Sequence, residues 1–412
     1  MGGIVIIGAG QAGTSLAAKL RMLGYQEAIT LIGKEPVPPY QRPPLSKGYL
    51  LGDIGLERLY LRAPSYWEEQ GVTLRLGSPV TAINRTAKFV RVDGECIPYD
   101  QLALTTGSRP RQIPTAVGGD LAGVYTVRTL ADVDAMAPEF QAGRRLLVVG
   151  GGYIGLEAAA VGAKLGLNVT LIEMASRILQ RVAAPETSDY FRRLHNSHGV
   201  RILESMGLVR LTGENRVSGV VLSDGSERPV DFVIVGIGIT PMTFLAEEAG
   251  LEIDNGIRTD ELGRSSDPHI WAAGDCASFP YKGGRIRLES VGNAIDQAET
   301  VAENMLGAGK AYKARPWFWS DQYDVKLQIA GLNTGYDHIA VRVGEGVSAS
   351  FWYYRNNQLL AVDVVNDVRA YMIGKRLIEA GRSPNPAIIT DTKADLHSLL
   401  KLREDQMLPL KN

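Results

Sequence analysis

Residues 4–20 read IVIIGAGQAGTSLAAKL, and this stretch decides the fold. A short apolar strand is followed by Gly8, Gly10 and Gly13 in G-x-G-x-x-G spacing, and then by an Ala- and Leu-rich helix. In such a unit the first glycine allows a tight turn, the second lets a pyrophosphate approach the backbone, and the third lets helix and strand pack closely. The phosphates then lie at the helix N-terminus, where free N–H groups favour negative charge. The stretch therefore predicts a dinucleotide-binding unit.

The same pattern occurs a second time, in RRLLVVGGGYIGLEAAAVGAKLGLNVTLIE at residues 144–173. This copy ends its second strand on Glu173, where an acid accepts hydrogen bonds from an adenosine ribose. We expect a nicotinamide dinucleotide here, held by Gly150, Gly152, Tyr153, Ile154, Gly155, Glu173 and, from a later strand exit, Gly238.

The first copy departs from this fingerprint in its second strand, AITLIGKE, which carries Gly33 where the other copy has Glu173. Glu35 is the candidate for a ribose contact, although Lys34 and a purely solvated loop acid remain alternatives. Two nicotinamide dinucleotides in one chain could not usefully exchange a hydride. We therefore expect FAD at the first site and NADH at the second.

Composition narrows the possible functions. The chain of 412 residues has room for about two or three domains. Its 44 Lys+Arg against 45 Asp+Glu lack the basic excess of a nucleic-acid-binding protein. No apolar run approaches the ~18 residues of a membrane-spanning helix. The N-terminus enters a strand at once, so no signal peptide is expected, and the distant Cys96 and Cys276 indicate a reducing, cytoplasmic location. No metal site is expected.

A second flavin-type signal lies at residues 264–277, RSSDPHIWAAGDCA, an apolar strand that ends in Gly274 and Asp275. With the N-terminal fingerprint it resembles the flavoproteins that have two dinucleotide-binding domains. In those proteins the Asp at this strand end binds the ribityl chain of FAD, and Asp275 matches it. The strand exits at 102–110 and 233–241 match the points where such chains cross between their FAD and NAD domains.

A collinear set of motifs makes the resemblance more specific: PYQRPPLSK (39–47), YLR (60–62), GGGYIGLE (150–157), GIGITP (236–241), GDCA (274–277), LESVGNAIDQA (288–298) and PWFWSDQYDVKLQI (316–329). The set resembles the putidaredoxin-reductase-like, NADH-dependent ferredoxin reductases. The resemblance implies electron transfer from NADH through FAD to a [2Fe-2S] ferredoxin that serves a bacterial cytochrome P450 or dioxygenase. The alternatives are a rubredoxin- or monodehydroascorbate-type reductase, or an apoptosis-factor-like flavoprotein with little turnover.

The fold class expected is α/β, with two Rossmann-like dinucleotide-binding domains and a C-terminal α+β domain that has an antiparallel sheet. The FAD domain is discontinuous, at 1–109 and 237–315, and the NAD domain occupies 110–236. The C-terminal domain covers 316–412. From Trp317 onward the sequence alternates as antiparallel strands do, and a helix is expected near 366–381.

The turn PYQRPPLSK carries the lysine to which the resemblance assigns a role. In the family this turn lies against the flavin ring, and its lysine reaches toward the N5 edge. Lys47 would need a partner when partly buried, and Glu157 is the candidate, so these two form the expected catalytic pair. Without the family context, a solvated lysine on a Pro-rich loop is the simpler interpretation.

Residue-by-residue matching extends the expected FAD site to Gly8, Gly10, Ala12, Gly13, Glu35, Arg42, Pro44, Lys47, Val80, Arg128, Asp275, Val291 and Trp319. Val80 and Val291 would otherwise be read as core residues, and Arg128 as the start of a surface helix. Trp319 either shields the flavin or belongs to an interdomain core.

An acid at residue 173 repels a 2′-phosphate and so favours NADH over NADPH, although Arg177 and Arg181 are placed to weaken that preference. The sequence has no paired redox cysteines, and PPLSK stands where disulfide reductases of similar architecture carry them. The partner expected is an acidic ferredoxin, bound transiently and electrostatically by a monomer or weak dimer. The candidate docking residues are Arg62, Arg285, Arg287, Lys326, Lys375 and Arg376.

Overall fold

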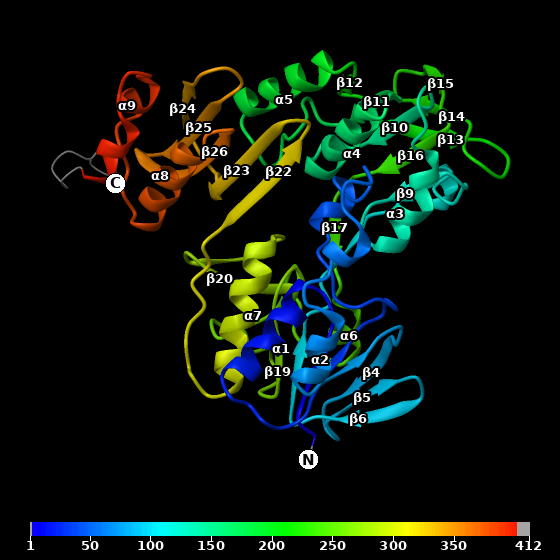
Figure 1. The fold of residues 1–412 in the computed structure, drawn as a ribbon, viewed down its shortest axis with the longest axis vertical. Coiled ribbons are helices and arrows are strands. Elements are labelled where there is room, and N and C mark those ends of the chain that lie inside the picture. Colours follow the sequence, from blue (N-terminus) through cyan, green and yellow to red (C-terminus); the bar gives the residue numbers. More distant parts are fainter. Residues whose placement is uncertain (1, 402–412) are drawn as a thin grey trace. The chain divides into compact units, whose positions relative to one another are not determined.

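The computed structural model describes residues 2–401 and separates into two compact units (Figure 1). The first unit contains residues 2–42, 54–109 and 239–316, and the second contains 43–53, 110–238 and 317–401. Within the described residues, every helix is too short or too polar to cross a bilayer.

The first unit is built on a parallel five-stranded sheet of order β19-β7-β1-β2-β3. These strands are β1 (Ile4–Ile7), β2 (Ile29–Ile32), β3 (Val72–Arg75), β7 (Gln101–Leu104) and β19 (Ile270–Ala272). The apolar residues of β1, β2, β7 and β19 are buried, as expected of strands covered on both faces, whereas the edge strand β3 buries only Val72. The glycine loop follows the central strand β1 directly, so the sheet places it at the carboxyl end of the strands.

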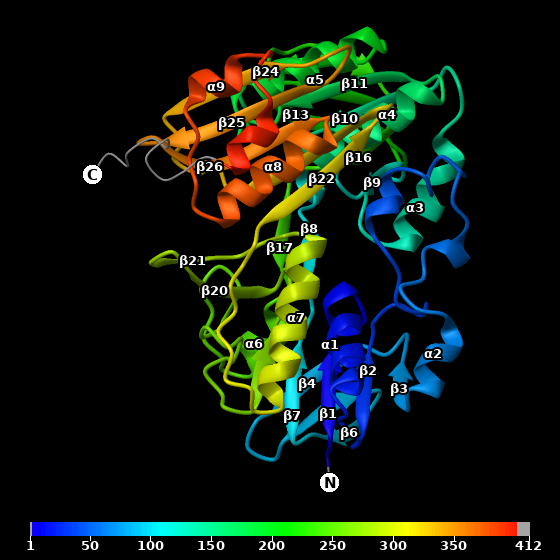
Figure 2. The ribbon, with the colours of Figure 1, turned by 60° about the vertical axis from the view of Figure 1, so that its left-hand side comes forward.

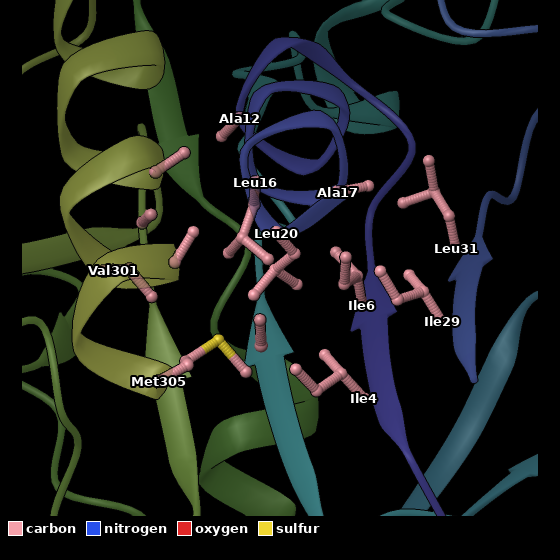
Figure 3. Close-up of a cluster of buried hydrophobic side chains, with 14 of the residues drawn as sticks. Ile4, Ile6, Ala12, Leu16, Ala17, Leu20, Ile29, Leu31, Val301 and Met305 are labelled. Carbon is pink, nitrogen blue, oxygen red and sulfur yellow. The ribbon is translucent and has the colours of Figure 1, made fainter. Parts of the chain in front are cut away.

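Helices α1 (Gln11–Met22) and α7 (Val291–Met305) lie side by side against this sheet (Figure 1). Leu16 and Leu20 of α1 point toward Val301 and Met305 of α7, and Ile4 and Ile6 of β1 complete the same buried cluster (Figure 3). This cluster fixes the direction of α1 and therefore the direction in which its N-terminus points.

The remaining elements of the first unit are small. An antiparallel sheet contains β4 (Val80–Asn84), β5 (Phe89–Val92) and β6 (Glu95–Pro98), and a second one contains β20 (Ala277–Tyr281) and β21 (Gly284–Ile286) with the parallel strand β18 (Ile257–Arg258). β8 (Ser108–Pro110) pairs with β17 (Ile239–Pro241). The helices are η2 (Leu56–Arg58), α2 (Pro64–Glu69) and α6 (Phe244–Glu248).

The second unit repeats the architecture with a parallel sheet of order β12-β11-β10-β16-β9. Its strands are β9 (Val124–Thr126), β10 (Arg145–Val149), β11 (Asn168–Glu173), β12 (Arg201–Glu204) and β16 (Phe232–Val235). The helices around it are η1 (Pro43–Ser46), η3 (Thr115–Val117), α3 (Leu130–Met136), η4 (Ala137–Glu139), α4 (Tyr153–Lys164) and α5 (Pro185–Ser197). A small antiparallel sheet contains β13 (Leu208–Thr212), β14 (Gly219–Leu222) and β15 (Glu227–Pro229).

Residues 317–365 form an antiparallel sheet of order β22-β23-β26-β25-β24. Its strands are β22 (Trp317–Gln322), β23 (Val325–Gly331), β24 (His338–Val343), β25 (Ala349–Arg355) and β26 (Gln358–Val365). Helix α8 (Val368–Glu379) packs against β23 and β26, and α9 (Pro386–Thr390) and η5 (Leu396–Leu400) follow it (Figure 2). The expected fold class is confirmed, including the antiparallel sheet and the helix near 366–381.

Candidate active site

The first glycine loop has the close contacts that the fingerprint requires. Gly8 has φ +114°, and a Cβ added to it would lie 2.2 Å from the carbonyl oxygen of Thr105. A Cβ on Gly13 would lie 2.1 Å from the carbonyl oxygen of Gly8. Both positions therefore exclude a side chain: Gly8 because of the tight turn, and Gly13 because α1 packs directly against the end of β1.

The middle glycine of the same loop faces open space. Gly10 is the N-cap of α1, with no side-chain cap hydrogen bond, and a Cβ added to it would meet nothing within 4 Å. The first N–H groups of a helix lack partners within the helix. The start of α1, which also includes Ala12, therefore fits a pyrophosphate that needs donors and backbone approach.

The second loop has the same geometry. A Cβ on Gly150 would lie 2.4 Å from the Gly236 carbonyl oxygen, and one on Gly155 would lie 2.0 Å from the Gly150 carbonyl oxygen. Gly152 caps α4 without a side-chain hydrogen bond and would meet nothing within 4 Å if it carried a Cβ. The chain thus carries two cradles of one kind, and each lies on its own parallel sheet.

Glu173 lies at the end of β11 with its carboxylate held by the backbone. It accepts the N–H of Gly151 at 2.7 Å and the N–H of Ala175 at 2.8 Å, one with each oxygen. A carboxylate has about four lone-pair sites, so both oxygens keep capacity for a ribose hydroxyl. The position fits the predicted ribose contact beside the second loop.

The two arginines that follow Glu173 differ in their surroundings. Arg177 donates to the Ser188 hydroxyl at 2.6 Å and is therefore engaged within the fold. Arg181 is exposed, and its guanidinium lies 3.6 Å from where a Cβ on Gly238 would be. Gly238 itself has φ +100°. Of the two arginines, Arg181 is the one that remains near a predicted nucleotide residue.

Tyr153 and Ile154 begin α4 and face different surroundings. The Tyr153 ring lies 4.9 Å from that of Phe318, centroid to centroid, and its buried hydroxyl has no hydrogen-bond partner among the described residues. Ile154 is 42% exposed, so its side chain is accessible at the start of α4.

On the flavin side, Asp275 follows β19 and is held in place. Its Oδ2 accepts the Ser108 hydroxyl at 2.8 Å, and Arg287 donates to its backbone carbonyl at 3.1 Å. Cys276, next to it, is fully buried, and burial raises the pKa of its thiol. This supports the interpretation of Cys276 as a packing residue rather than a nucleophile.

Two residues of this region were missed by the sequence reasoning. Thr105 donates its hydroxyl to the Gly8 carbonyl at 2.8 Å and so fixes the turn of the first loop. Gln297 is fully buried; its Oε1 accepts the Gly274 N–H at 2.9 Å, whereas its Nε2 has no partner within residues 2–401. An unsatisfied buried donor beside this loop is what a site built for a polar cofactor would have. The residues present therefore fit FAD.

Glu35 and Arg42, both predicted for the flavin site, are brought together. The Glu35 carboxylate accepts hydrogen bonds from Arg42 and from the Tyr40 hydroxyl. Val80 begins β4, Val291 begins α7, and Arg128 lies directly before the Thr129 cap of α3. The cofactor contacts of these residues stay predictions.

Lys47 and Glu157 form the expected ion pair. Lys47 Nζ lies 3.1 Å from Glu157 Oε1, and Glu157 is 3% exposed. Pro43 and Pro44 begin a 3-10 helix, η1, and the Lys47 N–H donates to the Pro44 carbonyl at 3.0 Å. Lys47 therefore follows a short, rigid element.

The carboxylate of Glu157 is surrounded by donors. Besides Lys47, the hydroxyls of Ser46 and Ser320 donate to it at 2.6 Å and 2.7 Å. Burial, the largest influence, raises the pKa of Glu157 above its usual value, although Lys47 and the two serines oppose it. Because its neighbours all donate, the ionised form is the one that this pocket satisfies.

Trp319 lies beside the ion pair, with the Lys47 ammonium 5.8 Å from its ring centroid. It stacks on Trp317 at 5.5 Å, and Lys375 lies over the Trp317 ring at 5.7 Å. Lys326 and these aromatic residues line one hollow of the second unit. Of the predicted docking residues on this unit, Lys326 and Lys375 thus lie at the hollow, and Arg376 is exposed on α8 beside Lys375.

The arginines predicted for docking on the first unit are used within the fold. Arg285 donates to the carbonyl oxygens of Thr259 and Ser278 at 2.7 Å and 2.6 Å. Arg287 pairs with Glu289. Arg62 lies over the Tyr66 ring, 5.5 Å from its centroid. These contacts show that Arg285 and Arg287 also have structural roles.

Comparisons with known proteins agree with this geometry. The pyridine nucleotide-disulphide oxidoreductase family matches residues 2–298, and the reductase C-terminal family matches residues 317–400. A ferredoxin–NAD(P)(+) reductase of Sphingomonas sp is 43% identical over 406 residues, which cover 96% of this chain and 97% of that protein. Putidaredoxin reductase of Pseudomonas putida is 40% identical over 407 residues and 96% of either chain.

A solved structure extends the likeness to three dimensions. The chain matches the crystal structure of the covalent putidaredoxin reductase–putidaredoxin complex with a TM-score of 0.94 and 40% identity, over 97% of this chain and 98% of that one. FAD and NAD(P)H are the cofactors that this kinship implies, and the two open helix starts fit them. The chain belongs to the pyridine nucleotide-disulphide oxidoreductase family, with the reductase C-terminal domain at its end.

Proposed function

We propose that this chain is an NADH-dependent, FAD-containing ferredoxin reductase that supplies a [2Fe-2S] ferredoxin of a cytochrome P450 or dioxygenase system. The observation that carries the proposal is the presence of two open glycine-lined helix starts in a chain that ends in a reductase C-terminal domain. The similarity to ferredoxin reductases over nearly the whole chain supports the choice of acceptor.

Bound FAD would supply hydride acceptance from NADH and release of single electrons, a chemistry that no side chain provides. The residues of this chain bind the two nucleotides and orient them. The start of α1, Asp275 and Gln297 hold the flavin nucleotide, together with the other predicted residues of the FAD site. The start of α4 and Glu173 hold the nicotinamide nucleotide. The domain division at 1–109 and 237–315, 110–236 and 316–412 belongs to the same proposal.

Lys47 supplies a fixed cation in this scheme. The ammonium is held by a buried carboxylate rather than by water, so it needs little reorganisation when negative charge develops on a bound group. Glu157 fixes the position of the ammonium through the 3.1 Å contact. The pair therefore acts by preorganised electrostatics, and neither residue has to transfer a proton.

The partner is expected to be an acidic ferredoxin bound transiently by a monomer or weak dimer. Lys326 and Lys375, which lie around the aromatic hollow, support this part of the proposal. If docking is electrostatic, ferredoxin reduction falls steeply with salt while reduction of ferricyanide by NADH changes little. The isolated Cys96 and Cys276 support a cytoplasmic location.

The test is a coupled assay with the purified protein. NADH, the flavin-loaded protein and cytochrome c are mixed with and without candidate [2Fe-2S] ferredoxins, and a rubredoxin serves as the rival acceptor. The proposal expects cytochrome c reduction to depend on a ferredoxin. A protein that takes up no FAD, or that reduces rubredoxin but no ferredoxin, would refute it.

A further inference from the structure

A chain of hydrogen bonds leads from Glu157 through buried side chains to the surface of the second unit. Ser320 Oγ lies 2.7 Å from Glu157, and Gln322 Nε2 lies 3.2 Å from Ser320 Oγ. His195 Nε2 is 2.7 Å from Gln322 Oε1, and its Nδ1 is 3.2 Å from the Tyr323 hydroxyl. Ser320, Gln322 and His195 are all 1% exposed or less.

The charge of Glu157 sets the direction of every bond in this chain. An ionised carboxylate only accepts, so the single hydroxyl proton of Ser320 is donated to it. The Ser320 oxygen is then left as an acceptor, so Gln322 must turn its NH₂ group toward it. The Gln322 carbonyl therefore faces His195, which must carry its proton on Nε2.

The last bond follows from the same rule. With its proton on Nε2, a neutral His195 ring offers Nδ1 only as an acceptor, and the Tyr323 hydroxyl donates to it. Burial lowers the pKa of His195 to about 4, so the ring is neutral near pH 7. All four bonds thus donate toward Glu157, and in a low-dielectric interior such bonds polarise and strengthen one another.

Tyr323, the outer end of the chain, is held in a conformation that tyrosine rarely adopts. It lies in the two-residue turn between β22 and β23 with φ +58°. A bulky residue in this region is strained and persists only where its surroundings fix it. Its ring stacks on the exposed His198 at 3.7 Å, and its hydroxyl meets His195. These contacts fix Tyr323 as the outermost donor.

We propose that Ser320, Gln322 and His195 are positioning residues for the Lys47–Glu157 ion pair. Their one-directional hydrogen bonds hold Glu157 as an acceptor-only carboxylate, which in turn holds the Lys47 ammonium in place. The proposal rests on the function assigned to Lys47 above. A protonated Glu157 can itself donate, so its hydrogen bonds would no longer all have to point toward it. The charge of Glu157 and the tautomer of His195 are therefore coupled.

The charged and titratable groups that face this chain come from three elements. Lys47 follows η1, and Asp321 on β22 lies 3.8 Å from the Lys47 ammonium. His195 and His198 come from the end of α5, and Tyr323 from the turn after β22. Among these groups Glu157 is the buried acid, so a protonated-carboxyl signal that disappears in Glu157→Gln reports on it.

The first test reads the tautomer of His195 in the wild-type protein. The flavin-loaded protein is labelled with ¹⁵N-histidine, and the His195 resonances are assigned by their loss in His195→Gln. We expect the Nε2–H tautomer in the wild-type protein, with no protonation of the ring between pH 6 and pH 8. In Glu157→Gln, where the carboxylate is gone, the tautomer becomes mixed. An Nδ1–H tautomer in the wild-type protein would overturn the proposal.

The second test measures Glu157 directly by infrared titration of its protonated-carboxyl band. Gln322→Met keeps the volume but breaks two bonds of the chain, and the titration midpoint is expected to rise by about half a pH unit to one pH unit. Ser320→Ala should raise the midpoint more, and Tyr323→Phe less. The effect should thus decline with the number of bonds that separate the residue from Glu157.

Ser350→Ala is the matched control, because Ser350 is equally buried but accepts the Trp352 indole N–H at 2.9 Å outside this chain. Its midpoint should equal that of the wild type. An unmoved midpoint in Gln322→Met, or an equal rise in Ser350→Ala, would overturn the proposal. Neither readout uses turnover, so failure of ferredoxin reduction alone would refute the proposed function and leave this inference standing.

Discussion

Glu173 is the residue whose role is easiest to isolate. Its carboxylate is oriented by two backbone N–H groups and retains lone pairs for a ribose diol. We expect Glu173→Ala to lower kcat/KM for NADH about 10- to 100-fold, since hydrogen bonds to a charged group are lost. The value for NADPH should fall less or rise, because the like-charge repulsion of a 2′-phosphate is removed.

Steady-state kinetics with both coenzymes test this prediction. Glu227→Ala on β15, an exposed acid in the same unit, is the control and should leave both values unchanged. If Glu173→Ala keeps the wild-type NADH/NADPH ratio, Glu173 does not select the coenzyme.

Lys47 should matter for stability as well as for chemistry. Lys47→Met leaves the Glu157 carboxylate buried without its cation, and removing one member of such a pair costs about 3–5 kcal/mol of unfolding free energy. Replacing both members with apolar residues, Lys47→Met with Glu157→Met, should cost less than Lys47→Met alone. Urea unfolding of the flavin-loaded variants gives this double-mutant cycle.

The control for this cycle is Lys164→Met, which removes an exposed lysine of α4 whose nearest acid, Asp53, is 4.0 Å away. Such a pair is worth under about 1 kcal/mol. If Lys47→Met and Lys164→Met lower the unfolding free energy equally, the Lys47–Glu157 pair contributes no more to stability than an exposed pair.

Among the helices, α4 allows a substitution at its start that should weaken nucleotide binding without destabilising the helix. Gly152 has extended backbone angles and open space, so Gly152→Asp fits without strain and caps the helix. Asp at an N-cap is at least as stabilising as Gly, but its charge repels a pyrophosphate. We expect unchanged or slightly higher thermal stability, a bound flavin, and at least about tenfold weaker NAD⁺ binding by calorimetry.

Gly10→Asp gives the matching control at the start of α1, where flavin rather than NAD⁺ should be lost. Wild-type NAD⁺ affinity in Gly152→Asp would place the nicotinamide nucleotide elsewhere.

Strand β26 carries a buried acid that the proposed function does not use. Asp363 is 1% exposed and accepts hydrogen bonds from Tyr353 and Thr187, and burial raises its pKa to about 7. Its folded pKa thus exceeds the unfolded value of 3.8, so the folded state binds the extra proton between these values. The stability contributed by this proton is full below about pH 4 and is lost as the pH rises through 7.

Asp363→Asn mimics the protonated acid and should remove this dependence. Between pH 4 and pH 8, the unfolding free energy of the wild-type protein should fall by on the order of 4 kcal/mol relative to that of Asp363→Asn. The measurement is the unfolding free energy of both proteins across this range, with the exposed Asp120→Asn as the control. Parallel curves for the wild type and Asp363→Asn would mean that Asp363 is ionised throughout.

The residues of the two nucleotide sites differ in how well the sequence predicts them. Both glycine loops and Glu173 could be predicted because their geometry depends on residues close together in the chain. Thr105 and Gln297 could not, because each meets a glycine loop only through tertiary packing: the Thr105 hydroxyl bonds Gly8, and the Gln297 amide bonds Gly274. Thr105 lies in the strand exit at 102–110 and Gln297 in the motif at 288–298, but nothing in either motif singles out the residue itself.

The Lys47–Glu157 pair also depends on a contact that no local sequence pattern predicts. Its members are far apart in the sequence, and the resemblance to a family rather than any local pattern indicated them. The residues behind Glu157 were missed: Gln322 and His195 lie 127 residues apart, and each alone resembles an ordinary buried polar side chain. Only the folded structure shows that they share one hydrogen-bonded chain.

For the whole molecule, the central claim is that one chain binds FAD and NADH at separate glycine-lined helix starts and transfers a hydride between them. Anaerobic titration of the purified protein with NADH, followed by visible absorbance, tests this claim most directly. We predict a yellow protein whose flavin absorbance is fully bleached by about one equivalent of NADH per FAD. A colourless protein, or a flavin that NADH leaves yellow, would contradict it.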